Sequence, residues 1–163
     1  MENTEKTYTW MALVDSTPRQ VDLTGNASLA EAIAAALQAE ALVDPSKIAC
    51  SEGSCGACCV RVDGERLLSC LAPAWRHFGA RIETAASWRA TDLPMRLAQA
   101  GAVQCGFCTP GLVVALGDLA DHGVKPKTEA ELADLLQAHL CRCTGYQQLL
   151  HAGLAWLNEQ ENS

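Results

Sequence analysis

The chain has 163 residues, of which 49% are hydrophobic and 5% aromatic, and its formal net charge is −7 at pH 7. This length suits one domain of ordinary size or two small ones. The negative charge and the lack of a run of Lys and Arg argue against binding to nucleic acid. No apolar run approaches the roughly 20 residues that a membrane-spanning helix needs, so membrane insertion is not expected.

The N-terminal stretch MENTEKTYTW lacks the apolar segment of a secretory signal. This absence predicts a cytoplasmic protein, with export to the periplasm by way of a partner subunit left open. In a reducing compartment, the nine cysteines are expected to be metal ligands or catalytic groups rather than disulfides. Their odd number also fits poorly with a disulfide framework.

The first half of the sequence is typical of mixed strand and helix. Two strands are predicted at Thr7–Val14 and Arg19–Thr24, joined by a turn at residues 16–18. An S-x-x-E capping box at residues 28–31 then begins a helix, because its two side chains can satisfy free backbone amides. An apolar stripe at intervals of four residues continues this helix to about Leu42.

A cysteine-rich loop follows the helix. After it, Asp63 and Gly64 stand between two short apolar runs, which is a strong hairpin signal. A last strand is predicted near residues 81–84. These elements together predict one compact α+β unit over residues 1–84.

From residue 85 onward the composition favours helix. The start signals are Asp and Pro, Thr and Pro, and a second capping box of the form T-x-x-E. Helices are expected at residues 92–101, at residues 109–119, from residue 128 onward, and at residues 146–158. Short connections between them suggest a small four-helix bundle over residues 85–163.

The first cysteine group has the spacing C-x4-C-x2-C, at Cys50, Cys55 and Cys58, and Cys70 follows as a distant fourth. This is the plant-type 2Fe–2S ferredoxin pattern. Two glycines inside the loop would let its backbone curl so that amides approach the sulfurs. A zinc site is the alternative, but zinc usually takes two C-x2-C-like knuckles, so the iron–sulfur cluster is favoured.

The second cysteine group comprises Cys105, Cys108, Cys141 and Cys143, in two turns that each run directly into a helix. Helix N-termini carry unpaired amides and partial positive charge, which favour an anionic iron–sulfur centre. The spacing C-x2-C with C-x-C is typical of no single metal. On spacing alone, zinc therefore stays open beside iron–sulfur for this group.

Taken together, the cysteine motifs resemble those of a known family. CSEGSCGACCVRVDG, Ser69–Cys70, QCGFCTPG and CRCTGY occur in the order and separation found in the iron–sulfur subunit of the molybdenum hydroxylases, the xanthine oxidase and aldehyde oxidase family. The resemblance extends from about Tyr8 to Leu157. It implies an α+β fold, in which an N-terminal β-grasp domain like a plant-type ferredoxin precedes a C-terminal four-helix bundle domain.

The resemblance also implies two 2Fe–2S clusters. The cluster facing the flavin side would be held by Cys50, Cys55, Cys58 and Cys70. The cluster nearest the molybdenum centre would be held by Cys105, Cys108, Cys141 and Cys143. Gln104 and Cys143 would contact the pterin of the molybdenum cofactor, which a large partner subunit would bind.

In such an enzyme this chain would carry electrons singly and would bind no substrate itself. The electrons would pass from the molybdenum centre to a medium subunit that binds FAD, or to a cytochrome. Two readings from other classes are a structural zinc-binding interaction module and a freestanding ferredoxin with two clusters. Metal analysis and co-purification distinguish them.

Two features depart from the family pattern. Cys59 stands where relatives usually have a small or hydroxylated residue, and an idle, half-buried thiol is favoured over a surrogate ligand. Gln147 and Gln148 replace the arginine or glutamine followed by proline or asparagine of many relatives. Tyr146 is read equally as packing against the second cluster or as anchoring its helix. Because the cysteines already fill two sets of four, ordinary surface or core positions are favoured for the histidines, which are His77, His122, His139 and His151.

Overall fold

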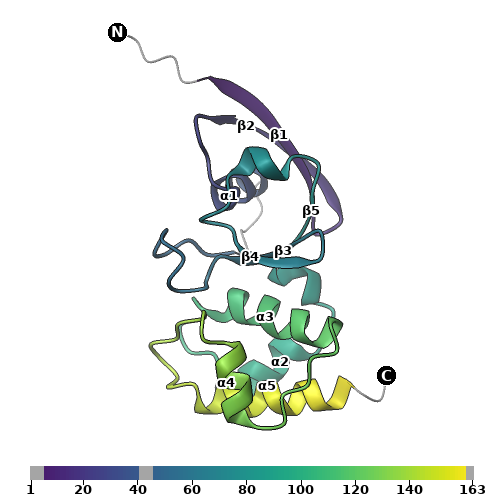
Figure 1. The fold of residues 1–163 in the computed structure, drawn as a ribbon, viewed down its shortest axis with the longest axis vertical. Helices are drawn as coiled ribbons and strands as arrows, with labels where there is room; N and C mark the ends of the chain where they lie inside the picture. Colours follow the sequence, from purple (N-terminus) through teal and green to yellow (C-terminus); the bar gives the residue numbers. More distant parts are fainter. Residues whose placement is uncertain (1–5, 41–45, 161–163) are drawn as a thin grey trace.

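The computed structural model describes residues 6–40 and 46–160. Over these residues the chain forms one five-stranded sheet, five α-helices and two short 3-10 helices (Figure 1). In chain order the elements are β1 (Thr7–Val14), β2 (Thr17–Thr24), α1 (Leu29–Ala39), β3 (Cys59–Val62), β4 (Glu65–Leu68), η1 (Ala74–His77), β5 (Arg81–Glu83), η2 (Ala85–Trp88), α2 (Leu93–Gln99), α3 (Thr109–Asp121), α4 (Glu129–Leu135) and α5 (Gln147–Glu159).

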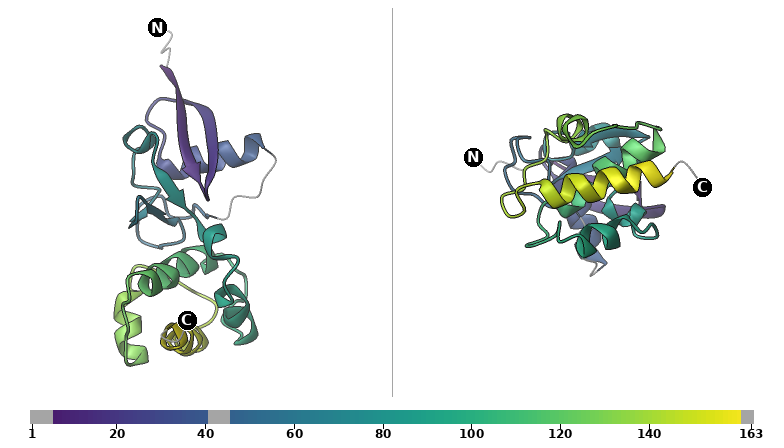
Figure 2. Two further views of the ribbon diagram at one scale, coloured as in Figure 1. Left: turned by 90° about the vertical axis from the view of Figure 1, so that its right-hand side faces the viewer. Right: turned by 90° about the horizontal axis from the view of Figure 1, so that it is seen from below.

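The sheet has the strand order β2-β1-β5-β3-β4, in which β1 and β5 run parallel and the other neighbours are antiparallel. Helix α1 covers one face of it, as the left view of Figure 2 shows. Trp10, Ile33, Val60 and Ile82 are fully buried between this helix and the sheet. The mixed α+β fold predicted from the sequence is confirmed at this level.

The first hairpin turns earlier than the sequence predicted. Asp15 and Ser16 have φ angles of 48° and 65°, so a two-residue turn joins β1 to β2. Strand β2 therefore begins at Thr17, not Arg19, and Pro18 lies within it, opposite Leu13. Proline is tolerated there because β2 is an edge strand, where a missing backbone N–H leaves no ladder bond broken.

The other local signals in this half behave as predicted. Asp63 and Gly64 form the turn between β3 and β4, with φ angles of 50° and 92°. The Ser28 box is complete, because the Glu31 carboxylate accepts the Ser28 N–H at 2.7 Å and the Ser28 hydroxyl accepts the Glu31 N–H. Helix α1 extends to Ala39, and its predicted continuation to about Leu42 lies outside the described residues.

The capping box predicted at the start of α4 is only half formed. The Thr128 hydroxyl accepts the Glu131 N–H at 3.2 Å, as expected. The Glu131 carboxylate, however, accepts the N–H of Lys127 at 2.7 Å instead of that of Thr128. The Glu131 carboxylate therefore fixes the backbone of Lys127, one residue before the cap residue Thr128, and leaves the Thr128 N–H without this bond.

Helices α2 to α5 pack at the end of the molecule away from β1 and β2 (Figure 1). Helix α5 contacts α2, α3 and α4, and a second apolar core lies among these helices. Cys59 of β3 belongs to this second core, so strand and helices share it. No helix in the described ranges is long and apolar enough to span a lipid bilayer.

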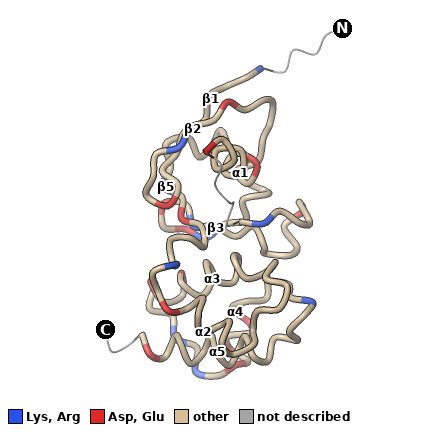
Figure 3. The backbone as a smooth tube through the Cα atoms, turned by 180° about the vertical axis from the view of Figure 1, so that it is seen from behind, with Lys and Arg blue, Asp and Glu red and all other residues tan. Residues whose placement is uncertain are grey.

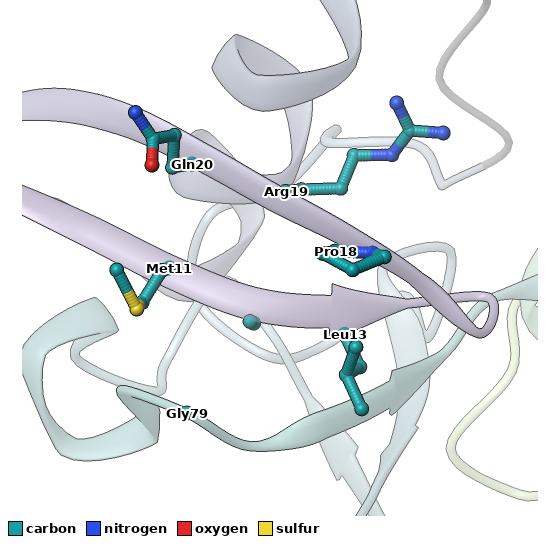
Figure 4. Close-up of a pocket in the computed structure, with 7 residues that line it drawn as sticks. Met11, Leu13, Pro18, Arg19, Gln20 and Gly79 are labelled. Carbon is teal, nitrogen blue, oxygen red and sulfur yellow. The ribbon is translucent and has the colours of Figure 1, made fainter.

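The far face of the sheet is only partly covered. Helix α3 packs on β3, whereas Met11 and Leu13 of β1 point away from α1 and are about 40% exposed (Figure 4). They line a shallow apolar hollow together with Pro18 and Gly79. Among the described residues, Lys and Arg occupy separate points along the backbone tube of Figure 3.

Arg61 joins the sheet to the helices. Its guanidinium donates to both carboxylate oxygens of Glu83 on β5, at 2.7 and 2.9 Å, and to Asp121 on α3 at 2.5 Å. It also lies 4.8 Å from the centroid of the Trp88 ring. The ring in turn rests on Gly117 of α3, where a Cβ would collide with the indole. One side chain that is 12% exposed therefore holds β3, β5, η2 and α3 together.

Arg61→Met is expected to lower the free energy of unfolding by about 3 kcal/mol, because it leaves two carboxylates without their partner. The Arg61 hydrogen bond holds the pKa of Glu83 below its ordinary value of 4.5. This stabilisation is therefore complete above pH 4.5 and is lost as the pH falls through the lowered pKa, so the variant and the natural protein should converge in acid. Anaerobic urea unfolding followed by circular dichroism measures both effects.

The matched control is Arg96→Met. Arg96 also pairs with two carboxylates, Asp92 at 2.5 Å and Glu159 at 2.6 Å, but its side chain is 37% exposed. Exposed pairs contribute about 1 kcal/mol or less, so this variant should be nearly as stable as the natural protein. Equal losses in the two variants would show that Arg61 has no special bracing role.

Candidate metal centres

The first cysteine group lies on the loop between α1 and β3 and on the turn after β4. The pKa shifts in this group indicate which thiols are neighbours, because Cys55 acts on the pKa of Cys50 and Cys58 acts on that of Cys70. The backbone N–H of Glu52, and then hydrogen bonds from side chains that include Cys55, lower the pKa of Cys50 to about 6. Burial and then the Cys58 thiol raise the pKa of Cys70 to about 11. The charge of Cys50 also raises the pKa of Cys70, so the two pairs are neighbours.

The second cysteine group joins the turn before α3 to the turn before α5. The Cys143 and Cys105 sulfurs are 3.5 Å apart, and both residues are exposed. Cys108 and Cys141 are both buried. Burial, and then Cys141, raise the pKa of Cys108 to about 12. The structure thus brings Cys105 and Cys143 into contact as an exposed outer pair. Cys108 and Cys141 form a buried inner pair, in which Cys141 is near enough to act on the pKa of Cys108.

Backbone amides surround the sulfurs of the second group. The N–H of Phe107 is the main cause of the lowered pKa of Cys105. Burial raises the pKa of Cys141, but hydrogen bonds from the Thr144 hydroxyl and from the amides of Thr144 and Cys143 outweigh it, so the pKa is lowered. Such donors stabilise sulfur as thiolate, which is the form that binds metal.

The paired arrangement fits a two-iron centre better than a single ion. Tetrahedral zinc needs four ligands around one point. A 2Fe–2S cluster instead spreads four thiolates over two irons, two on each, and sulfurs grouped two and two with amides aimed at them meet that requirement.

The two cysteine groups lie against each other. The N–H of Leu140, which precedes Cys141, donates to the carbonyl of Cys55 at 2.9 Å. Gly111, in the first turn of α3, rests on the carbonyl of Gly56, where a Cβ would collide with it. One backbone hydrogen bond, from Leu140 to Cys55, therefore links the two cysteine groups.

Gly56 has no room for a side chain. Its φ angle is 71°, and a Cβ there would collide with the carbonyl oxygen of Ala138 and lie 2.6 Å from Nδ1 of His139. His139 is 5% exposed, and burial lowers its pKa to about 4, with Arg66 adding to the effect. It is thus a neutral core histidine, as predicted. His122 and His151 lie beside Asp118 and Glu129, which are acidic partners rather than cysteines.

Gln104 is exposed and directly precedes Cys105, at the outer pair of the second group. Phe107 and Leu140, which flank Cys108 and Cys141 in sequence, are 42% and 62% exposed. Three exposed residues, one with a polar amide and two with apolar side chains, thus directly precede cysteines of the second group in the sequence. Beside the first group, the exposed residues Leu71 and Trp75 line one hollow with Cys70, and exposed Phe78 follows three residues after Trp75.

Cys59 belongs to neither cysteine group and differs from them in its apolar surroundings. It is 3% exposed in the apolar core shared with α3, and burial raises the pKa of its thiol to about 12. It is more buried than the half-buried position that the sequence analysis expected. The arrangement favours an idle thiol, because the sulfur is both protonated and enclosed by apolar neighbours.

Comparison with known proteins agrees with this geometry. A family described as the 2Fe-2S binding domain matches residues 82–154. The xanthine dehydrogenase iron-sulfur-binding subunit of Escherichia coli O157:H7 is 44% identical over 114 residues, which cover 66% of this chain and 71% of that one. The chain belongs to the iron–sulfur subunits of the molybdenum hydroxylase family.

Other members of the family are similar along comparable lengths. Caffeine dehydrogenase subunit gamma of Pseudomonas sp. (strain CBB1) is 36% identical over 122 residues, covering 71% of this chain and 73% of that one. A chain in the crystal structure of quinoline 2-oxidoreductase from Pseudomonas putida 86 superposes with a TM-score of 0.82 at 28% identity, over 95% of this chain and 96% of that one. The family predicted from the motifs is confirmed, and the chain is an iron–sulfur subunit of an oxidoreductase.

Three contacts of the site were not foreseen from the sequence. They are the Leu140–Cys55 hydrogen bond, the bracing by Arg61, and the hydroxyl of Tyr146, which accepts the Cys141 N–H at 2.7 Å. From the sequence, Tyr146 is expected only to pack against the second cluster or to anchor its helix. A tyrosine three residues after the C-x-C pair was the available signal, but its φ of 68°, which turns the ring back onto Cys141, is not visible in sequence.

Proposed function

We propose that the chain relays single electrons through two 2Fe–2S clusters, from the molybdenum centre of a large partner subunit to a FAD-binding subunit or another acceptor. Cys50, Cys55, Cys58 and Cys70 would hold one cluster, and Cys105, Cys108, Cys141 and Cys143 the other. When bound, such a cluster takes up one electron and passes it on. The observation that carries the proposal is the contact between the sulfurs of Cys105 and Cys143, which are 3.5 Å apart although the two residues stand on different turns, one before α3 and one before α5.

The division into domains follows the two cores. We place a β-grasp, ferredoxin-like domain at residues 1–84 and a four-helix domain at residues 85–163. The support is that α1 and the sheet enclose one apolar cluster and α2 to α5 enclose another. The match to the 2Fe-2S binding domain begins at residue 82, close to the proposed boundary.

The chain's own backbone supplies the route between the groups. From the Cys141 side, the path runs along one peptide bond to Leu140 and across a 2.9 Å hydrogen bond to the carbonyl of Cys55. Gly56 and Gly111 let the two loops approach to van der Waals contact. Buried apolar residues around Cys108 and Cys141 exclude water from this inner side.

The two outer sides suit different partners. Gln104 and the exposed Cys143 would meet the pterin of the molybdenum cofactor, with Phe107 and Leu140 becoming covered by the large subunit. On the other side, Leu71, Trp75 and Phe78 would be covered by the subunit or cytochrome that accepts the electrons. Exposed apolar groups beside each centre are expected of a subunit whose two ends are interfaces.

The test is anaerobic native purification of the chain through an affinity tag. We expect a larger polypeptide and molybdenum to accompany it, and we expect its iron to be reduced when the intact complex receives a substrate of its molybdenum centre. A solitary chain with its full iron and no larger partner would overturn the subunit assignment and leave a freestanding ferredoxin.

A further inference from the structure

In the C-R-C-T-G-Y turn, the side chain of Thr144 contacts the sulfur of a proposed cluster ligand, Cys141. Its Oγ1 lies 3.1 Å from the Sγ of Cys141, within hydrogen-bond range for sulfur. The same oxygen accepts the N–H of Tyr146 at 3.3 Å. Thr144 thus links the sulfur of Cys141 to the first residue before α5.

The direction of the hydroxyl proton follows from these two contacts. The Tyr146 N–H is a donor, so it occupies a lone pair of the Thr144 oxygen. A cysteine that binds iron does so as thiolate and has no proton to give. With Cys141 as a ligand, the remaining possibility along the 3.1 Å contact is that Thr144 donates its proton to the sulfur.

The turn holds this geometry from the opposite side as well. The Tyr146 hydroxyl accepts the N–H of Cys141 at 2.7 Å and donates to the carbonyl of His139 at 3.1 Å. The backbone of Cys141 is therefore fixed by a side chain while its sulfur is fixed by Thr144. The contact between Thr144 and Cys141 is therefore fixed by two separate hydrogen bonds, one on the Thr144 oxygen and one on the Cys141 backbone.

We propose that Thr144 raises the reduction potential of the centre held by the second cysteine group, by donating a hydrogen bond to the Cys141 thiolate. Adding an electron increases the negative charge on the ligand sulfurs, and a donor aimed at a sulfur stabilises that charge. The inference rests on the proposed function, because it takes Cys141 as an iron ligand.

The test compares Thr144→Val with Thr144→Ser in an EPR-monitored redox titration. Valine keeps the shape and removes the donor, whereas serine keeps the donor. We expect a lower midpoint potential for the second centre in Thr144→Val, a nearly natural one in Thr144→Ser, and no change in the first centre in either. Thr144→Ala is measured in parallel, so that the donor's loss is tested even if valine disturbs the turn.

An unchanged potential in Thr144→Val and Thr144→Ala, with full iron content, would overturn the proposal. An equal shift in Thr144→Ser would also overturn it, because the hydroxyl would then not be the cause. A failure of the proposed function looks different: the unmodified chain would itself lack one of its two reducible centres.

Discussion

Cys143→Ser is expected to lower the iron content from about four to about two atoms per chain, because one of two 2Fe–2S centres loses a ligand. Cys143 is exposed and 3.5 Å from the sulfur of Cys105, so it belongs to the outer pair of the second group. A hydroxyl is a poor substitute for a thiolate toward iron. The EPR signal of the first centre should remain, while that of the second should be lost or broadened, and electron flow from molybdenum should fall.

Cys59→Ser is the matched control, because it is the same substitution at a buried cysteine outside both groups. It should retain both signals and the full iron content. Loss of iron there would make Cys59 a ligand. Loss of the first centre's signal in Cys143→Ser would show that the division of the cysteines into two groups is wrong.

Gly111→Ala is expected to destabilise the protein by about 3 kcal/mol, at the upper end of the cost of overpacking. The new methyl group would collide with the carbonyl oxygen of Gly56 and lie 3.2 Å from the Cα of Ala57. Both obstacles are backbone, so neither can rotate away. The loops of the two cysteine groups would be forced apart, and the Leu140–Cys55 hydrogen bond would lengthen or break.

The effect has two readouts. Anaerobic urea unfolding measures the loss of stability, and the magnetic interaction between the two reduced centres measures their separation. Gly153→Ala is the control, because Gly153 is also helical but a Cβ there meets only side-chain atoms of Leu116 and Leu132, at 3.1 to 3.4 Å. Alanine also favours helix by about 1 kcal/mol over glycine, so this variant should lose little. Equal behaviour of the two variants would contradict the close contact of the loops.

Local chemistry made much of this fold predictable. Asp63 and Gly64 take up the positive φ angles that a two-residue hairpin needs, and Ser28 with Glu31 closes its capping box without help from distant residues. The cysteine spacings predict two groups of four thiols, and this grouping stays a prediction, with Cys105 and Cys143 3.5 Å apart in the structure. Where a prediction slipped, as at Pro18, the deciding fact was that β2 is an edge strand, which depends on the whole sheet.

Contacts between residues far apart in the chain could not be predicted from the sequence, because they too depend on the whole fold. The Leu140–Cys55 hydrogen bond joins residues that are 85 positions apart in the sequence, and neither cysteine motif indicates that the other lies beside it. Arg61 reads as an ordinary strand residue until Asp121 and Glu83 are brought to it. Gly111 could have been suspected, because a glycine in the first turn of an apolar helix is unfavourable unless another backbone approaches it.

The most direct test of the account is the iron and acid-labile sulfide content of the natively purified, correctly folded protein, with EPR of its reduced form. Two 2Fe–2S centres require about four irons and four sulfides per chain, with two distinguishable signals. A folded preparation that contains zinc in place of iron, or that is colourless and free of iron, would contradict it.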